Sequence, residues 1–217
     1  MEFGLILSNT NRSKTYIKLL VKNSLYPKEI FFYSKKRNKF FLKFFLKKKL
    51  KYCYFKTQNI NNPHFIKKIL KSKLKNLIYS GYSGQIINSD LLKKKNLIHC
   101  HPGKLPNYRG STTIFYSLIN ERAIACSVFK MTKKIDMGKI YYIKNFITPK
   151  NLNKINNKFD DYIRASTIIS FLKNNRTIVK NKKYFNDYYI AHTVIRRIAL
   201  NRGSLFFLKK LNYDQKN

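Results

Sequence analysis

Residues 96–110 read NLIHCHPGKLPNYRG and carry the strongest structural signal in the chain. The first six residues are typical of a buried strand, which Pro102 and Gly103 bring to an end. Because side chains alternate between the two faces of a strand, His99 and His101 share one face and Cys100 points to the other. The two prolines and two glycines of the following loop restrict its path. This stretch therefore predicts two imidazoles at the end of a buried strand.

The segments on either side of this stretch alternate between strand and helix patterns. Residues 34–60 are rich in Lys and Phe and are compatible with helix or strand. Pro63 favours a helix start, and Ser111 is a candidate cap for a later helix. The alternation predicts an α/β sheet. The expected strands are residues 5–7, 29–33, 77–80, 96–101, 125–131 and 139–146, and the expected helices are residues 16–25, 63–70, 114–119 and 153–172. A second apolar segment covers residues 188–200.

Composition limits the class of protein. The chain has 217 residues, of which 44% are hydrophobic, enough for one domain with a small appendage. The apolar stretch at residues 40–45 is too short and too charged to cross a bilayer. Residues 1–7 lack a basic leader and are interpreted as a strand, so a cytoplasmic location is expected. Three cysteines, an odd number, argue against a disulfide framework and favour a reducing compartment.

The chain is strongly basic, with 46 Lys and Arg against 9 Asp and Glu and a formal net charge of +37. Such a charge is compatible with nucleic acid, an anionic membrane surface or an acidic substrate. The lysines are scattered through every segment, and scattered charge is a weaker sign of nucleic-acid binding than a clustered stripe. A nucleic-acid partner is therefore not expected.

A second motif, KIDMG at residues 134–138, lies in a turn between two expected strands. Ligands of open α/β sheets bind outside the carboxyl ends of the strands, where His99 and His101 are expected. The turn could bring Asp136 to the same edge. A zinc site is not expected, because Cys100 faces away from the histidines and no second ligand pair has a fitting spacing.

These motifs resemble the folate-dependent formyltransferase family, which includes glycinamide ribonucleotide, methionyl-tRNA and nucleotide-sugar formyltransferases. The family signature is Asn-x-His followed by Pro or Gly, a Leu-Pro-x-x-x-Gly loop, and an Asp about 35 residues later with a Gly close behind. The segment at residues 80–87 is similar to the family's loop that packs against the folate pterin. The resemblance spans roughly residues 1–150. The matching signature positions are His101, Pro102, Leu105, Pro106, Gly110, Asp136 and Gly138.

The resemblance implies a Rossmann-like, open and mostly parallel α/β sheet flanked by helices. Residues 1–150 would form the catalytic domain, and residues 151–217 a helical C-terminal extension packed on it. The donor would be 10-formyltetrahydrofolate. A donating His101 would stabilise the oxyanion that forms when an amine attacks the formyl carbon, and Asp136 would orient it and help to remove the amine proton. The expected donor-binding residues are Ser83, Gly84, Gln85, Ile86, Ile87, Met131 and Ile135, and the expected substrate-binding residues are Arg12, Ser13, Tyr108, Arg109 and Gly110.

One departure from the family concerns His99, which replaces the usual Asn. His can donate a hydrogen bond to an oxyanion, but its tautomer and charge depend on its surroundings. The change is compatible with a functional replacement, a change of specificity or a loss of activity. We favour replacement, because His retains the donor capacity that the site needs.

The acceptor is inferred by elimination. We expect that 217 residues leave no room for the RNA-contacting domain of methionyl-tRNA formyltransferases. Formyltetrahydrofolate hydrolases carry an extra N-terminal regulatory domain, whereas this chain is expected to start directly with the first strand. The loop at residues 8–13 lacks the glycine with which glycinamide ribonucleotide transformylases grip phosphate, although Arg12 and Ser13 could bind an anion at a helix N-terminus. An amino group on a nucleotide-linked sugar is therefore expected, with Arg12, Lys104 and Arg109 near its phosphates. The alternatives are the other two acceptors, an inactive folate-binding homologue and an RNA-binding module. A homodimer is compatible with the sequence.

Overall fold

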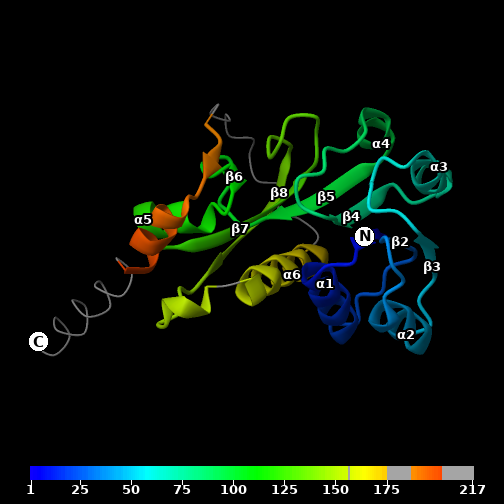
Figure 1. Ribbon diagram of the computed structural model, residues 1–217, viewed down its shortest axis with the longest axis horizontal. Coiled ribbons are helices and arrows are strands. Elements are labelled where there is room, and N and C mark those ends of the chain that lie inside the picture. Colours follow the sequence, from blue (N-terminus) through cyan, green and yellow to red (C-terminus); the bar gives the residue numbers. More distant parts are fainter. Residues whose placement is uncertain (156, 175–186, 202–217) are drawn as a thin grey trace, which may run out of the picture.

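The computed structural model describes residues 1–155, 157–174 and 187–201 (Figure 1). Within this part of the chain, seven strands form one sheet in the order β3-β2-β1-β4-β5-β7-β8. The strands are β1 (Gly4–Ser8), β2 (Ile30–Tyr33), β3 (Tyr52–Phe55), β4 (Asn76–Ser80), β5 (Asn96–His101), β7 (Ile124–Lys130) and β8 (Ile140–Phe146). The helices are α1 (Asn11–Lys22), α2 (Lys39–Lys47), α3 (Pro63–Lys71), α4 (Ser89–Lys94), α5 (Ile114–Glu121), the short η1 (Leu152–Lys154) and α6 (Asn157–Lys173).

The sheet is parallel over its first five strands in spatial order, and β7 and β8 complete it as an antiparallel hairpin. The register pairs Leu5 of β1 with Ile30 of β2 and Ile78 of β4. Because parallel strands end at the same edge, the loops after β1, β4 and β5 meet there. The predicted fold, a Rossmann-like mostly parallel sheet flanked by helices, is confirmed.

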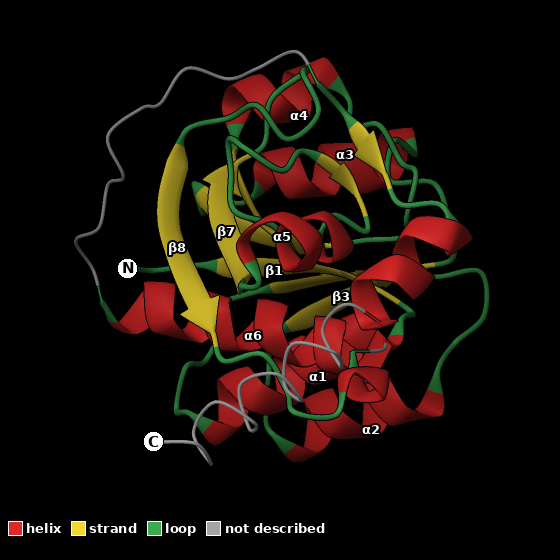
Figure 2. Ribbon diagram, turned by 90° about the vertical axis from the view of Figure 1, so that its left-hand side faces the viewer, coloured by secondary structure: helices red, strands yellow, loops and turns green. Residues whose placement is uncertain are grey.

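Helices cover both faces of the sheet (Figure 2). On one face α1, α2 and α6 pack over alternate strand residues such as Leu5, Ile98 and Cys100. On the other face α3 and α4 pack over residues such as Ile6 and Leu77. Buried apolar side chains on both sheet faces explain why the inner strands read as continuous apolar runs.

Asparagine and threonine side chains fix most helix starts. Thr10 caps α1, and Asn38, Asn62 and Asn88 cap α2, α3 and α4 by accepting backbone N–H groups of the first turn. The expectation that Ser111 caps a helix is wrong. Ser111 lies in the short strand β6 (Gly110–Ser111), whereas α5 starts after Thr113, whose hydroxyl donates to the Pro102 carbonyl.

The remaining expected strands and helices are present, and the open stretch at residues 34–60 contains α2 and β3. The described end of the chain returns to the edge of the sheet beside α5 (Figure 1). There β9 (Tyr189–Ile190) pairs with β6, and residues 193–201 are helical. Parts of the predicted extension, residues 175–186 and 202–217, lie outside the described residues. No described helix has the length and apolar character that a membrane span requires.

Candidate active site

A cavity of about 1040 Å³ opens at the carboxyl edge of the sheet. Its walls come from the loops after β1, β4 and β5, from the turn between β7 and β8, and from the first turns of α6. Both histidines of β5 line it, and so does Asp136. The structure thus confirms that His99 and His101 share a face, while Cys100 is buried against α1 and α6.

His101 is almost fully buried, and both of its ring nitrogens have partners. Nε2 lies 2.7 Å from the carbonyl oxygen of Tyr108 and 3.0 Å from the hydroxyl of Thr113. A carbonyl can only accept, and the Thr113 hydroxyl donates to the Pro102 carbonyl at 3.0 Å, so Nε2 carries the hydrogen. Nδ1 is left facing Oδ2 of Asp136 at 3.5 Å. In neutral His101, Nδ1 is therefore the nitrogen that can take up a proton.

The surroundings of His101 act on its pKa in opposite directions. Burial lowers the pKa, Asp136 raises it, Arg164 lowers it and the bond to the Tyr108 carbonyl raises it, and the net direction is downward. Asp136 thus offsets part of the desolvation that disfavours the imidazolium. The ring is neutral at pH 7, with a carboxylate in place to stabilise its charged form.

The backbone holds Asp136 in place. Its φ of 54° lies in the left-handed region, which Asp tolerates better than most residues. Oδ2 also accepts the backbone N–H of Gly110 at 3.2 Å, and Arg109 donates from Nε to the Ile135 carbonyl at 3.3 Å. The loop after β5 is therefore tied to the turn that carries Asp136, although the two are separated by a helix and a strand.

Gly103 makes room for the bonds of His101. A Cβ atom at this position would lie 2.6 Å from the Thr113 hydroxyl, 2.8 Å from the Tyr108 carbonyl and 2.9 Å from His101 Nε2. These distances are shorter than van der Waals contact. A side chain at position 103 would therefore displace the groups that fix the His101 tautomer.

His99 is held in the opposite tautomer. Its Nδ1 lies 3.1 Å from the Tyr79 carbonyl oxygen of the neighbouring strand, so Nδ1 is the donor. Burial lowers the pKa of His99 well below its ordinary value, and the positive charges of Arg164 and Arg12 lower it further. The neutral ring therefore presents an Nε2 that accepts. In this tautomer Nε2 has no hydrogen to donate, and the expected replacement of the family's Asn by His99 stays a prediction.

The predicted donor-binding residues come together, since all seven line the cavity. Ile86 and Ile135 are 71% and 51% exposed, which is unusual for isoleucine and leaves apolar surface for a ligand. Gln85 has a structural role as well, because it accepts from the Tyr33 hydroxyl at 2.9 Å.

The predicted substrate-binding residues divide into two groups. Arg12 and Gly110 line the cavity, although Arg12 Nη2 donates to the Gly81 carbonyl at 2.6 Å and ties α1 to the loop after β4. Ser13, Tyr108 and Arg109 do not line it. Ser13 is buried, and its hydroxyl bonds to the Ser80 carbonyl at 2.8 Å.

Tyr108, Arg109 and Lys104, which are also expected near the substrate, have other contacts in the structure. Tyr108 acts through its backbone carbonyl, while its ring packs near Tyr189. Arg109 is buried against the turn that carries Asp136. Lys104 pairs with Glu121 at 3.2 Å, away from the cavity.

Sequence reasoning missed the contribution of α6. Arg164 donates from Nη1 to the Cys100 carbonyl at 2.8 Å and from Nε to Asp160 Oδ2 at 2.8 Å, so the helix is anchored to the end of β5. Asp161 beside them is buried, and burial together with Asp160 raises its pKa to about 6. Two adjacent carboxylates, Asp160 and Asp161, are conspicuous in a chain with 9 acidic residues, and this pattern could have pointed to α6 as part of the site.

Two residues near the end of the described chain, Tyr188 and Arg196, also line the cavity. Arg196 donates from Nε to the Ala191 carbonyl at 3.1 Å, and its guanidinium lies 5.8 Å from the centre of the Phe115 ring. The Tyr116 hydroxyl bonds to the Ile190 carbonyl at 3.2 Å. These contacts hold the segment on α5.

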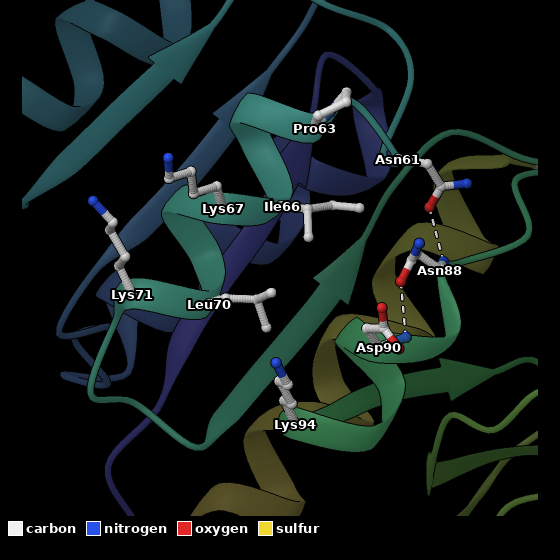
Figure 3. A pocket seen from close by; sticks show the side chains of 9 residues that line it. All are labelled: Asn61, Pro63, Ile66, Lys67, Leu70, Lys71, Asn88, Asp90 and Lys94. Carbon is white, nitrogen blue, oxygen red and sulfur yellow. Dashed lines mark hydrogen bonds between the residues drawn. The ribbon is translucent and has the colours of Figure 1, made fainter.

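A second cavity of about 500 Å³ lies between α3 and α4, on the other face of the sheet (Figure 3). Lys67, Lys71 and Lys94 surround the apolar Ile66 and Leu70, and Asn88 bridges Asn61 and Asp90 through hydrogen bonds. Its lining contains neither histidine of β5 and no Ser, Thr or Cys side chain. Across the described residues, no cluster of three or more His, Cys, Asp or Glu side chains has a geometry that could hold a metal ion.

Comparison with known proteins gives a consistent picture. The chain is 38% identical over 68 residues to a methionyl-tRNA formyltransferase of Lactobacillus acidophilus, a match that covers 30% of this chain and 22% of the relative. No protein-family model matches the chain. The sequence match thus spans less than a third of the length of the curated relatives.

Solved structures share the fold over most of the chain. A sugar N-formyltransferase from Shewanella has a TM-score of 0.57 at 18% identity, covering 94% of this chain and 88% of its own. A glycinamide ribonucleotide transformylase from Symbiobacterium toebii has a TM-score of 0.56 at 14% identity, covering 83% and 91%. Curated relatives and structural neighbours together point to the formyltransferase family, as the motifs predict.

Proposed function

We propose that the protein transfers a formyl group from 10-formyltetrahydrofolate to a primary amine. One observation carries the proposal: the buried His101–Asp136 pair lies at the end of β5, in a cavity that all seven expected donor-binding residues line. A perturbed His with a specific carboxylate partner in a cavity is a candidate for acid–base chemistry. The matches to methionyl-tRNA and sugar formyltransferases support the same reaction.

The cavity fits a folate donor in size and lining. Small-molecule sites commonly measure about 300–1,000 Å³ and combine apolar walls with a few polar groups. Ile86, Ile87 and Met131 would contact the flat ring system, and backbone groups of residues 83–87 and 131–136 would bond to its polar edge. The donor supplies the formyl carbon that the amine attacks.

His101 and Asp136 would act as a unit. The Tyr108 carbonyl and the Thr113 hydroxyl fix the Nε2–H tautomer, which leaves Nδ1 as the nitrogen that can hold a proton beside Asp136. Protonation at Nδ1 gives a cation that Asp136 stabilises at 3.5 Å and that favours negative charge developing on the formyl oxygen. Positioned acid–base groups of this kind contribute about 10²–10⁴-fold to rate.

For the acceptor we favour an amino group on a nucleotide-linked sugar. The cations Arg12, Lys133 and Arg196 line the cavity and suit a diphosphate. The sugar N-formyltransferase neighbour aligns with 94% of this chain, compared with 83% for the ribonucleotide transformylase. In the loop after β1, Thr10 caps α1 and the Ser13 hydroxyl bonds to the Ser80 carbonyl, so Arg12 is the residue of the expected anion site that lines the cavity.

Methionyl-tRNA is the second candidate acceptor, because the curated relatives that the sequence matches are methionyl-tRNA formyltransferases. The positive charge of this chain would bind tRNA non-specifically, so binding alone does not discriminate. Turnover does. Formylation of a nucleotide-linked amino sugar and of methionyl-tRNA should be compared at equal concentration and physiological salt, after calorimetry with a folate analogue. Failure of the analogue to bind at high concentration would contradict the donor, and faster formylation of methionyl-tRNA would reverse the order of the acceptors.

A further inference from the structure

Two histidines line the cavity, and they differ in which nitrogen is available. Both ring nitrogens of His101 have partners within 3.5 Å. Within residues 1–155, 157–174 and 187–201, Nδ1 of His99 has a hydrogen-bond partner, the Tyr79 carbonyl at 3.1 Å, and Nε2 has none. Among the described residues, the side-chain N and O atoms that are sealed from solvent without a hydrogen bond are Arg12 Nε and Tyr16 Oη. The unpartnered Nε2 of His99 is therefore open to the cavity.

The open nitrogen is a lone-pair acceptor. The Tyr79 carbonyl cannot donate, so the hydrogen of the neutral ring is on Nδ1 and Nε2 has none. The bond also orients the ring, because Tyr79 lies on β4, the strand next to β5. The Phe129 ring of β7 packs edge-on against the other side, with centroids 5.9 Å apart. These contacts fix the orientation of the His99 ring, which lines the cavity.

On these grounds we propose that His99 is the general base that takes the proton of the acceptor amine through Nε2. The proposal rests on the proposed function and goes beyond it, because an Asn amide at this position would offer a donor and no base. The replacement at position 99 would then exchange one catalytic role for another and would not merely conserve a hydrogen bond.

The step balances with one proton. As the acceptor nitrogen bonds to the formyl carbon, its proton passes to His99 Nε2. When the bond between the formyl carbon and the donor nitrogen breaks, His99 gives this proton to the donor nitrogen and returns to its neutral form. His101 takes its own proton at Nδ1 from solvent before the attack and keeps it beside Asp136 while the oxygen is charged, so the two histidines handle separate protons.

The charges around His99 keep it in the form that a base needs. Arg12 of α1 and Arg164 of α6 face it together with His101 of its own strand, and these groups and burial lower its pKa. The other titratable groups that line the cavity are Tyr79, Tyr82, Lys133, Asp136, Asp160, Asp161, Tyr188 and Arg196. His99 is therefore neutral at pH 7 with its Nε2 lone pair available, and because burial and the two arginines disfavour the imidazolium, the proton that it accepts passes on to the donor nitrogen.

Nitrogen-15 NMR of the histidine rings tests the assignment without any substrate. The chain has 4 histidines, and the His99→Asn variant identifies the signals of His99. We expect Nδ1 of His99 to be protonated and Nε2 to be bare at pH 7, with a titration midpoint below 6.5. An Nε2–H tautomer or an imidazolium at pH 7 would overturn the base role.

Kinetics give the second readout. His99→Asn is expected to lower kcat by about 10²-fold or more, with KM little changed and measurable residual activity. His99→Ala is expected to recover rate with added imidazole, in proportion to the neutral imidazole present. An Asn variant as fast as the wild type, with an unchanged melting temperature, would show a donor role and overturn the inference. A wild type with the expected tautomer but no formyl transfer would overturn the proposed function, and the base role with it.

Discussion

Nδ1 of His101 lies 3.5 Å from Oδ2 of Asp136, although 34 residues of other structure, including α5 and all of β7, separate them in sequence. The side chains are 4% and 12% exposed. At this depth an imidazolium and a carboxylate stabilise one another far more than at the surface. Once His101 is protonated, the pair therefore holds a positive charge next to which a negative charge can develop.

Replacement of His101 by Ala is expected to lower kcat by about 10²–10³-fold, because it removes the group that meets the oxyanion. Steady-state kinetics with a formyl-labelled donor measure this. His64→Ala is the matched control, since His64 is exposed on α3 and does not line the cavity. A His101→Ala variant with near wild-type rates would show that the roles are wrongly assigned.

Removal of the Thr113 hydroxyl is expected to loosen His101. Thr113→Val takes away the buried group that bonds to His101 Nε2 and to the Pro102 carbonyl, and it should destabilise the protein by about 1–3 kcal/mol. Thr113→Ser keeps the hydroxyl and should stay close to wild type. Urea unfolding compares the variants, and equal stability of the Val and Ser variants would contradict the structural role of this hydroxyl.

The charge of Arg164 is expected to set the acid limb of the pH–rate profile. Arg164 lowers the pKa of both His99 and His101, so its removal in Arg164→Met should raise both pKa values toward 6.5. Protonation would then begin at higher pH, and the acid limb of kcat/KM should move upward. Arg164→Lys retains the charge and should keep the limb near its wild-type position. An identical limb in the Met variant would show that this cation does not act on the histidines.

The buried Asp161 is expected to reduce stability at neutral pH. Burial and Asp160 raise its pKa to about 6, above the ordinary 3.8, so folding favours the protonated form. Its favourable contribution is complete below about pH 3.8 and is lost as the pH rises through about 6. Asp161→Asn should therefore be more stable than wild type by about 1–3 kcal/mol at pH 7.5, with the difference shrinking toward pH 4. Urea unfolding across this range is the measurement, with the exposed Asp90→Asn as a control that should show no such gain.

Local patterns explain what could be predicted from the sequence. The β5 stretch is apolar, ends at Pro102 and alternates faces, so the sequence alone predicts that its two histidines lie on one face. The Asp136 turn follows from two flanking strands. Residues 34–60 were ambiguous, because a run such as KFFLKFFLK at residues 39–47 fits a helix with Phe41 and Phe45 inward as well as a strand pattern.

Contacts between distant segments explain what could not be predicted. The tautomer of His99 depends on a carbonyl of β4, and that of His101 on a loop carbonyl and on Thr113. The role of Arg164 depends on where α6 packs. Helical periodicity indicates which residues of a helix face inward, but it does not indicate which strand end they meet. The sequence predicts that Tyr108 and Arg109 bind substrate, because it does not show which groups they contact. In the structure the Tyr108 carbonyl bonds to His101, and Arg109 bonds to the turn that carries Asp136.

The most direct test of the proposed function is transfer of labelled formyl from 10-formyltetrahydrofolate to an amine, measured for the wild type and for Asp136→Asn side by side. The Asn side chain keeps the shape of Asp136 but removes the charge that stabilises protonated His101. The structure predicts that the wild type yields labelled N-formyl product from a nucleotide-linked amino sugar, and that Asp136→Asn folds normally but is slower by about 10²-fold or more. Absence of labelled product with every amine acceptor offered, methionyl-tRNA and glycinamide ribonucleotide included, or equal rates for the two proteins, would contradict the proposed function.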